Sequence, residues 1–284
     1  MSTLSNKIDF AVIFTVTDAN PNGDPLNGNR PREDYDGYGE ISDVCIKRKI
    51  RNRLQDMGER IFVQSDDRCD DGCDSLRTRV NNCDEVSQYS KGNKKDNDAY
   101  AKAACEQWID VRSFGQVFAF SGLSNSVRGP VSIGITKSVS PIDVISMKIT
   151  KSVNSESEEK VKGPDTMGTK HRVAFGLYKM CGSINCQLAE KTGFTDEDAE
   201  KIKQALITLF ENDASSARPD GSMAVCRVYW WKHNGKTPKY SSAKVHGSLK
   251  IKEKDGVKKP MSFDDYEITV DKMEGLEPEI IDLT

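Results

Sequence analysis

The feature of this sequence that most restricts its fold is the order of its segments with a strong apolar pattern. Residues 8–16 form a short, β-branched apolar run that is typical of a buried strand. Three later segments also have the pattern of strands, namely 131–139, 173–184 and 223–231. A helical pattern follows the strand at 8–16, and another follows the strand at 173–184. The resulting order, strand, helix, strand, strand, helix, strand, is that of the split βαβ or ferredoxin-like fold.

Two helices are predicted from apolar stripes that repeat every three or four residues. The first follows an N-cap candidate, Ser42, and spans about 20 residues. Its stripe consists of Ile46, Ile50, Leu54, Met57 and Ile61. The second helix begins at a capping-box pattern at 195–198, and its stripe consists of Ile202, Ala205, Leu206, Leu209 and Phe210. Lys47 and Arg51 flank the first stripe on one side and Lys49 on the other, which predicts a half-cationic surface.

Two hydrophilic stretches interrupt this order of core elements. Residues 64–107 contain a crowded run of aspartates, and a short helix is expected near 99–108. Residues 140–172 begin with an alternating strand at 144–153 and continue as a polar excursion rich in Ser, Glu and Lys. Because both stretches lie inside one pattern of core elements, we expect a single decorated α+β domain over residues 1–284.

Charge and composition exclude some classes of protein. The chain has 41 Lys and Arg against 44 Asp and Glu, a net charge of −3, so its surface is not uniformly basic. A local basic stripe would still be compatible with nucleic-acid binding. No run approaches the ~18 apolar residues of a membrane span, and residues 1–9 have no apolar signal core. We therefore expect a cytoplasmic protein with no membrane partner, whose 8 cysteines are free thiols.

The sequence offers little for a metal centre or a catalytic nucleophile. Cys69, Cys73 and Cys83 lack the short paired spacing of a zinc site, and the 3 histidines are scattered. The aspartate run fails the EF-hand pattern, because Cys69 and Thr78 stand at ligand positions. Motifs for a serine nucleophile, a P-loop or dinucleotide binding do not occur. We expect no metal, no cofactor and no catalytic activity.

One constellation leaves an enzymatic alternative open. The turn region after the first strand contains Asp18 and Asp24, which could hold a divalent metal for phosphodiester cleavage. Asn, Gly and Pro crowd the same stretch, so a role in turn formation explains both aspartates more simply. A partial RNA-recognition pattern at 112–117 lacks its second aromatic residue, and we regard it as accidental.

Six short blocks occur in an order that resembles a known family. They are Asn-Pro-Asn-Gly-Asp-Pro at 20–25, Arg-Pro-Arg at 30–32, and the segments 42–51, 110–117, 129–131 and 218–221. The resemblance extends over residues 8–231. No single block is specific, but the ordered set resembles the repeating backbone subunit of type I CRISPR Cascade complexes. It is closest to the type I-C (Csd-type) branch.

This resemblance implies a fold and a function. It implies a ferredoxin-like palm, a modified RNA-recognition motif, with fingers at 64–107 and a thumb at 140–172. Copies of the chain would assemble head to tail along one CRISPR guide RNA in antiviral defence, forming a helical filament. They would displace guide bases at intervals and present the rest for pairing with a target DNA strand. The implied partners also include a guide-end cap, a large and a small subunit, and a nuclease–helicase recruited by the complex.

The resemblance implies roles for residues at the start of the first helix. Ser42, Lys47 and Arg51 match the helix positions that hold the phosphates of the guide RNA. Asn22 and Gly23 match the loop before that helix. Side chains one turn apart on a helix can contact successive phosphates, and a helix N-terminus adds backbone donors.

Further candidates lie in the thumb and in a later loop. Arg218 stands where a loop is expected to approach the RNA. Within the thumb we take Met147 and Met167 as candidate wedges, because a soft apolar side chain can part stacked bases. The candidates for steadying a displaced nucleotide are Lys170, His171 and Arg172.

Two other functions stay open at this point. Related backbone subunits of type III complexes cleave bound target RNA with a loop aspartate, so Asp18 or Asp24 could make this chain a metal-dependent RNase subunit. The type I resemblance argues against this, because type I complexes recruit a separate nuclease. The remaining alternative is a stand-alone RNA-binding protein that never assembles.

Overall fold

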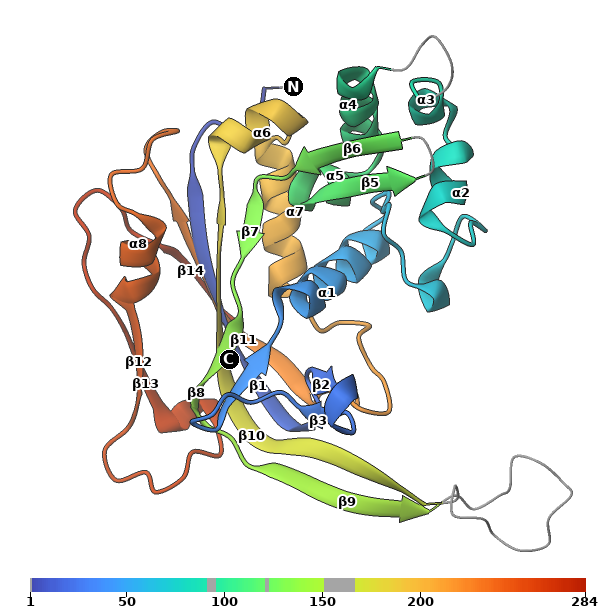
Figure 1. The fold of residues 1–284 in the computed structure, drawn as a ribbon. Coiled ribbons are helices and arrows are strands. Elements are labelled where there is room, and N and C mark those ends of the chain that lie inside the picture. The colour runs from blue at the N-terminus through green and yellow to red at the C-terminus, as the bar shows by residue number, and fades with distance from the viewer. Residues whose placement is uncertain (1, 91–95, 121–122, 151–166) are drawn as a thin grey trace, which may run out of the picture.

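The computed structural model describes residues 2–90, 96–120, 123–150 and 167–284, and it has a mixed α/β architecture. A large antiparallel sheet runs through its centre in the strand order β14-β11-β1-β10-β8-β4, and β7 and β9 pair with β10 as well (Figure 1). The strands of this sheet are β1 (Ile8–Ala19), β4 (Tyr38–Ile41), β7 (Val131–Ile133), β8 (Thr136–Pro141), β9 (Val144–Thr150), β10 (Met167–Ile184), β11 (Met223–Lys232) and β14 (Glu279–Asp282).

Smaller sheets and the helices surround this central sheet. The paired strands outside it are β2 (Gly23–Asp24) with β3 (Arg30–Pro31), β5 (Gly115–Phe120) with β6 (Leu123–Arg128), and β12 (Leu249–Glu253) with β13 (Tyr266–Val270). The α-helices are α1 (Asp43–Asp56), α2 (Leu76–Asn81), α3 (Asp84–Ser87), α4 (Asn97–Gln107), α5 (Ile109–Phe114), α6 (Cys186–Thr192), α7 (Asp196–Ile207) and α8 (Ser242–Ser248). Short 3-10 turns occur at Pro25–Asn27, Asp66–Arg68 and Phe263–Asp265.

The central strand β1 is buried on both faces, which explains the continuous apolar run at 10–14. Phe10, Val12 and Phe14 belong to the core formed with α1 and α7. Ala11 and Ile13 point to the opposite face, where α8 and the β12–β13 pair cover the sheet (Figure 1). Successive side chains of a strand alternate between its faces, so only a continuous apolar run can satisfy two cores.

The stretch at 64–107 packs around a hydrophobic cluster distinct from the two that line the sheet. Its largest members are Phe62, Tyr100, Trp108 and Phe118, which contact one another through their rings. Helices α2 to α5 and the β5–β6 hairpin form this region beside α1 (Figure 1). The short helix expected near 99–108 is confirmed as α4.

Several predicted boundaries change in the structure. The first helix ends at Asp56 instead of near 61, because Gly58 adopts a positive φ of 86° that stops it. The strand predicted at 131–139 is divided into β7 and β8. The capping box of the second helix is confirmed, with Thr195 and Asp198 bonded reciprocally. Within the described ranges, no helix is both long and apolar enough to span a membrane.

Candidate nucleic-acid interface

A two-stranded arm projects from one end of the sheet. It consists of β9 and residues 167–173 of β10, paired in antiparallel register from Val144–Val173 to Thr150–Met167 (Figure 1). This arm coincides with the two flanks of the predicted thumb, and the intervening residues 151–166 lie outside the described part of the chain. Most side chains of β9 are exposed, so the arm offers two surfaces to a ligand.

The two faces of the arm differ in chemistry. Ile145, Met147 and Ile149 alternate along β9 and therefore share one face. The register sets Lys170 opposite Met147, so this face is both apolar and basic. Met167 pairs with Thr150 and lies on the other face. The two candidate wedges are exposed by 45% for Met147 and 63% for Met167, but they point to opposite sides of the arm.

The three basic residues predicted on the arm all have partners within the protein. Lys170 Nζ donates to the carbonyl oxygen of Ser216 at 2.6 Å. His171 Nδ1 lies 2.8 Å from Ser146 Oγ across the arm. Arg172 Nε lies 2.9 Å from Asp18 Oδ1, at the end of β1. The Lys170 and Arg172 contacts join the arm to its base, so a ligand there would meet two cations in fixed positions.

The start of α1 brings three of the predicted residues together. Ser42 is the N-cap, and its Oγ accepts a hydrogen bond from Cys45 N at 3.3 Å. Asn22 Oδ1 accepts from Ser42 N at 2.9 Å, which fixes the loop against the helix. Gly23 follows in β2, where a Cβ would overlap the side chain of Asn29. The loop and the helix N-terminus therefore form one local structure.

The two predicted cations of α1 lie in different surroundings. Lys47 Nζ pairs with Asp43 Oδ2 at 2.9 Å near the surface, and this ammonium holds the pKa of Asp43 below its usual range. Arg51 instead donates through Nε to the fully buried Asp110 at 2.9 Å and lies over the ring of Phe114. The structure therefore separates Arg51 from the group formed by Ser42 and the loop before it.

Sequence reasoning missed the role of the block at 110–117. Asp110 accepts hydrogen bonds from Phe62 N and Val63 N as well as from Arg51, which joins α5 to α1. Arg112 forms a two-pronged bond with Asp198 at 2.8 and 2.9 Å, which joins α5 to α7. Two opposite charges two residues apart therefore connect α5 to both helices that cover the sheet. Only the pairing of Asp110 and Arg112 with distant partners reveals this role.

Arg218 belongs to a partly buried group of charges that patterning alone does not reveal. Its Nε lies 3.2 Å from Asp213 Oδ2, and Lys49 of α1 pairs with the same oxygen. Lys49 is only 3% exposed, so the expectation that it lies on a solvated cationic flank is wrong. Burial lowers the pKa of the Lys49 ammonium, and the carboxylate of Asp213 opposes this. The 213–222 loop, which connects α7 to β11, is thus attached to α1.

The two aspartates of the enzymatic alternative have structural partners. Asp18 has a positive φ of 51° and pairs with Arg172. Asp24 Oδ1 accepts from Leu26 N at 3.2 Å, which caps a 3-10 turn, and lies 3.5 Å from Arg32. Among the residues that the structure describes, no group of three or more His, Cys, Asp or Glu side chains is placed to hold a metal ion. The Asp24 cap fits the turn-forming role, whereas the Asp18 pair joins the end of β1 to the arm.

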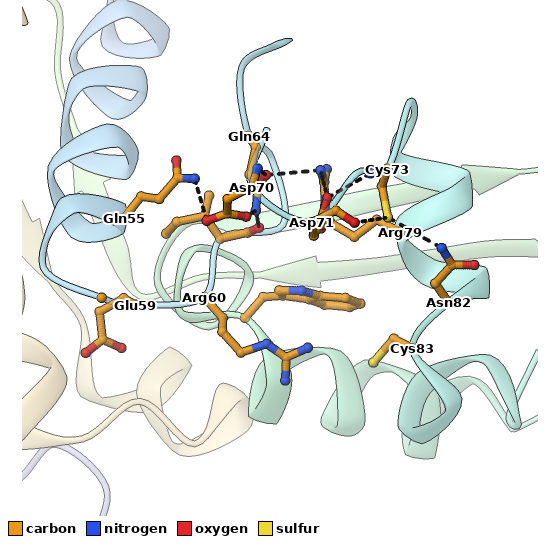
Figure 2. Close-up of a pocket in the computed structure, with 13 residues that line it drawn as sticks. Gln55, Glu59, Arg60, Gln64, Asp70, Asp71, Cys73, Arg79, Asn82 and Cys83 are labelled. Atoms are coloured by element: carbon orange, nitrogen blue, oxygen red, sulfur yellow. Dashed lines mark hydrogen bonds and ion pairs between the residues drawn. The ribbon is translucent and has the colours of Figure 1, made fainter. Parts of the chain in front are cut away.

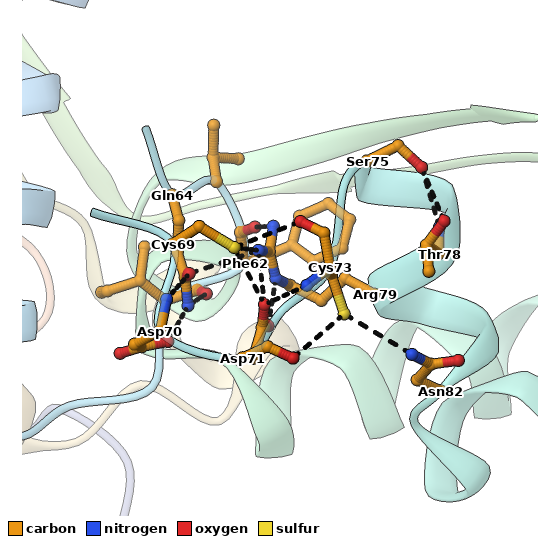
Figure 3. Close-up of polar contacts among 12 residues, drawn as sticks. Phe62, Gln64, Cys69, Asp70, Asp71, Cys73, Ser75, Thr78, Arg79 and Asn82 are labelled. Carbon is orange, nitrogen blue, oxygen red and sulfur yellow. Dashed lines mark hydrogen bonds and ion pairs between the residues drawn. The ribbon is translucent and has the colours of Figure 1, made fainter. Parts of the chain in front are cut away.

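A polar cleft of about 350 Å³ lies between the C-terminal end of α1 and α2 (Figure 2). Arg79 lines this cleft, and its guanidinium donates to Phe62 O at 2.8 Å and to Asp71 Oδ1 at 2.9 Å (Figure 3). This guanidinium holds the pKa of Asp71 well below its usual range. Burial raises the pKa of the Cys83 thiol, which favours the protonated form over a metal-binding thiolate. Part of the aspartate run is therefore used in internal bonds.

An exposed apolar and basic arm beside a helix N-terminus defines a candidate nucleic-acid-binding protein. The chain belongs to the Cas7 family, because a family model described as "CRISPR-associated protein Cas7" matches residues 6–271. A protein of Haloferax volcanii with the same description is 28% identical over 242 residues, which cover 76% of this chain and 67% of that protein.

Two solved structures share the fold. One is a chain of a "CRISPR RNA-guided surveillance complex, pre-nicking", with a TM-score of 0.52 and 15% identity over 84% of this chain and 81% of that one. The other is a chain of a "CRISPR RNA-guided surveillance complex", with a TM-score of 0.50 and 16% identity over 89% of this chain and 78% of that one. None of these descriptions supports the RNase alternative.

Proposed function

We propose that this chain is a guide-RNA-binding backbone subunit of a Cascade-type surveillance complex. Its copies assemble head to tail along one CRISPR RNA, displace guide bases at intervals and present the others for pairing with target DNA. The observation that carries the proposal is the match of the Cas7 family model to residues 6–271. The order of the short sequence blocks further supports a subunit of the type I-C branch.

The strand order supports a ferredoxin-like palm at the centre of the molecule. The adjacent strands β11, β1, β10 and β8 are all antiparallel to their neighbours, as this fold requires. Helices α1 and α7 cover the same face of these strands (Figure 1). On this proposal, residues 64–107 are the fingers and residues 140–172 are the thumb, both inserted in one domain.

The guide backbone is proposed to bind at the start of α1, next to the base of the arm. Asn22, Gly23 and Ser42 shape the loop and the helix N-terminus there, and Lys47 supplies a cation one turn further along. Arg218, from the 213–222 loop, and Arg51, further along α1, would contribute charge, although each also pairs with an aspartate of the protein. The contacts position the RNA without reading its sequence.

The arm is proposed to displace a guide base. Met147 or Met167 would enter a base step, and the opposite directions of the two side chains mean that each face of the arm offers one wedge. Lys170, His171 and Arg172 would then steady the displaced nucleotide. Substituting one methionine at a time identifies the face that meets the RNA.

The remaining parts of the proposal concern partners and chemistry. Within the complex, the chain would contact further copies of itself, the guide-end cap, the large and small subunits and, through the assembly, a recruited nuclease–helicase. It would work in the cytoplasm as a non-catalytic scaffold. A filament of head-to-tail contacts needs two complementary patches on each copy, and a guide of fixed length would limit its growth.

Native mass spectrometry of the protein with single-stranded RNAs of graded length tests this function. The expected result is a stepwise rise in bound copies with RNA length, with intact RNA in the presence of either magnesium or a chelator. Shortening of the RNA at regular intervals only with magnesium would overturn the scaffold and make the loop aspartates the candidate site. A single bound copy at every RNA length would instead favour the stand-alone RNA-binding protein.

A further inference from the structure

The turn that follows β1 is connected to four separate segments of the protein. Asn20 is its central residue and is only 4% exposed. The Asn20 main-chain N–H donates to Ala217 O at 2.9 Å, and its Nδ2 donates to Asn29 O at 2.6 Å. One buried residue thus holds both the 213–222 loop and the β2–β3 hairpin.

The residues on either side of Asn20 reach two further segments. Asp18 lies beside Arg172 of the arm, and its positive φ of 51° is a conformation that few residues other than glycine adopt. Asn22 accepts from the main-chain N–H of Ser42, which begins α1. Positions 18, 20 and 22 therefore each contact a different part of the proposed RNA-binding surface.

The same segments are also joined directly to one another. Lys170 of the arm donates to Ser216 O of the 213–222 loop, and Arg30 of the hairpin donates to Ser146 Oγ of the arm at 3.0 Å. Gly28 lies against the arm, because a Cβ placed there would lie 3.9 Å from His171 Nε2. The turn, the hairpin, the arm and the loop thus form a closed ring of polar contacts whose geometry depends on direction as well as distance.

We infer that residues 18–22, which end β1 and begin the turn after it, act as a positioning turn with Asn20 at its centre. This turn sets the relative placement of the arm, the α1 N-terminus, the β2–β3 hairpin and the 213–222 loop. This inference rests on the proposed function, because these are the segments assigned to the guide RNA. Asn20 acts through the segments that it holds and need not touch RNA. The asparagines of the Asn-Pro-Asn block are thus assigned to geometry rather than to direct contact.

The substitution Asn20→Asp tests the inference, because it keeps the size of the side chain but removes the Nδ2 donor that faces Asn29 O. Asn6→Asp is a matched control, since Asn6 Nδ2 donates to His233 O at 2.6 Å near the opposite end of β1. Both variants lose one side-chain bond to a main-chain carbonyl. A merely structural role predicts similar losses of melting temperature and similar RNA binding for the two.

The positioning role predicts a different result. Asn20→Asp should weaken binding of single-stranded RNA by roughly tenfold and lower the slope of log affinity against log salt, because the cations of the arm and the loop would no longer be held along one RNA path. Asn6→Asp should leave both quantities at the wild-type values. RNA affinity and salt slope that are equal in Asn20→Asp and wild type would overturn the inference while leaving the proposed function intact. Wild-type protein that binds no RNA would overturn both.

Hydrogen exchange of the RNA-free protein gives an independent measurement. In Asn20→Asp, the amides of the 213–222 loop and the β2–β3 hairpin should exchange at least several times faster than in wild type, with no change in α8. The milder variant Asp18→Asn, which removes one charge from the pair with Arg172, should act on the arm alone. Uniform changes over the whole chain in both variants would show general destabilisation and would contradict a positioning turn.

Discussion

Arg51 and Asp110 illustrate how one residue pair can connect two parts of the molecule. Asp110 is fully buried and accepts three hydrogen bonds, from Arg51 Nε, Phe62 N and Val63 N. Asp110→Ala leaves the guanidinium and two main-chain donors without their acceptor. We expect a loss of about 3–5 kcal/mol in the free energy of unfolding, measured by urea denaturation. Asp67→Ala, on the exposed part of the aspartate run, should change stability by less than about 0.5 kcal/mol. Equal effects of the two substitutions would contradict this account.

Lys47 offers the cleaner test of phosphate binding by α1. Its partner Asp43 lies on the same helix near the surface, so Lys47→Ala should alter stability by no more than about 1 kcal/mol. If Lys47 contacts one phosphate of the guide, the substitution should weaken binding to RNAs of any sequence and lower the salt slope by about 0.7. Lys191→Ala, in α6, serves as an exposed control. The prediction fails if the slope is unchanged in filter-binding titrations over a range of salt concentrations.

Residue types and spacing predict charge, but they do not reveal which charges are already paired. Lys47 and Lys49 are two positions apart and equally basic in sequence, yet one lies near the surface and the other is buried against Asp213. The acidic partner stands 164 residues away, so no local pattern could have identified it. The same holds for Arg51 and Asp110. Candidate RNA contacts on α1 could therefore be predicted as a group, but not sorted individually.

At the scale of elements, periodicity correctly predicted the central strands and both covering helices. The close approach of two backbone segments at the base of the β5–β6 hairpin left no such pattern. Gly115 has a positive φ of 78°, and a Cβ on either Gly115 or Gly129 would overlap main-chain atoms of the other segment. These two glycines fall in two of the sequence blocks, and the structure supplies the physical reason for their type.

Gly129→Ala should therefore loosen the hairpin and its attachment to α5. The added methyl group would overlap Ser113 O and Gly115 N, which are main-chain atoms that cannot rotate away. We expect a destabilisation of about 1–3 kcal/mol, the usual cost of forcing extra volume into a packed site. Gly235→Ala is the matched control, because nothing lies within 4 Å of a Cβ at that position. Similar melting temperatures for the two variants would argue against this close approach of the two backbone segments.

At the scale of the whole molecule, the sequence predicts one large sheet but not how the C-terminal segment joins it. Helix α8 and the β12–β13 pair cover the second face of the sheet, and β14 adds an edge strand (Figure 1). The apolar residues of this segment are few and widely spaced, because each small element buries only one or two side chains. Strand β12 pairs with β13 across the intervening residues 254–265, and no local pattern indicates that pairing.

The junction between α8 and the sheet should make the stability of the molecule depend on pH. His246 Nε2 lies 3.0 Å from Gly182 O. Burial lowers the pKa of His246 from its usual 6.5. The charge of Asp9 opposes this shift, and the charges of Lys179 and Lys7 add to it. The folded protein thus binds this proton less readily than the unfolded chain does. The contribution of His246 to the free energy of unfolding should therefore be complete above about pH 6.5. It should decrease as the pH falls from there towards the lowered pKa, by at most about 1.4 kcal/mol per pH unit. His246→Gln keeps a donor for Gly182 O but cannot titrate, so its free energy of unfolding in urea should fall less between about pH 7 and 5.5. Parallel pH profiles for the variant and wild type would rule out His246 as the titrating group.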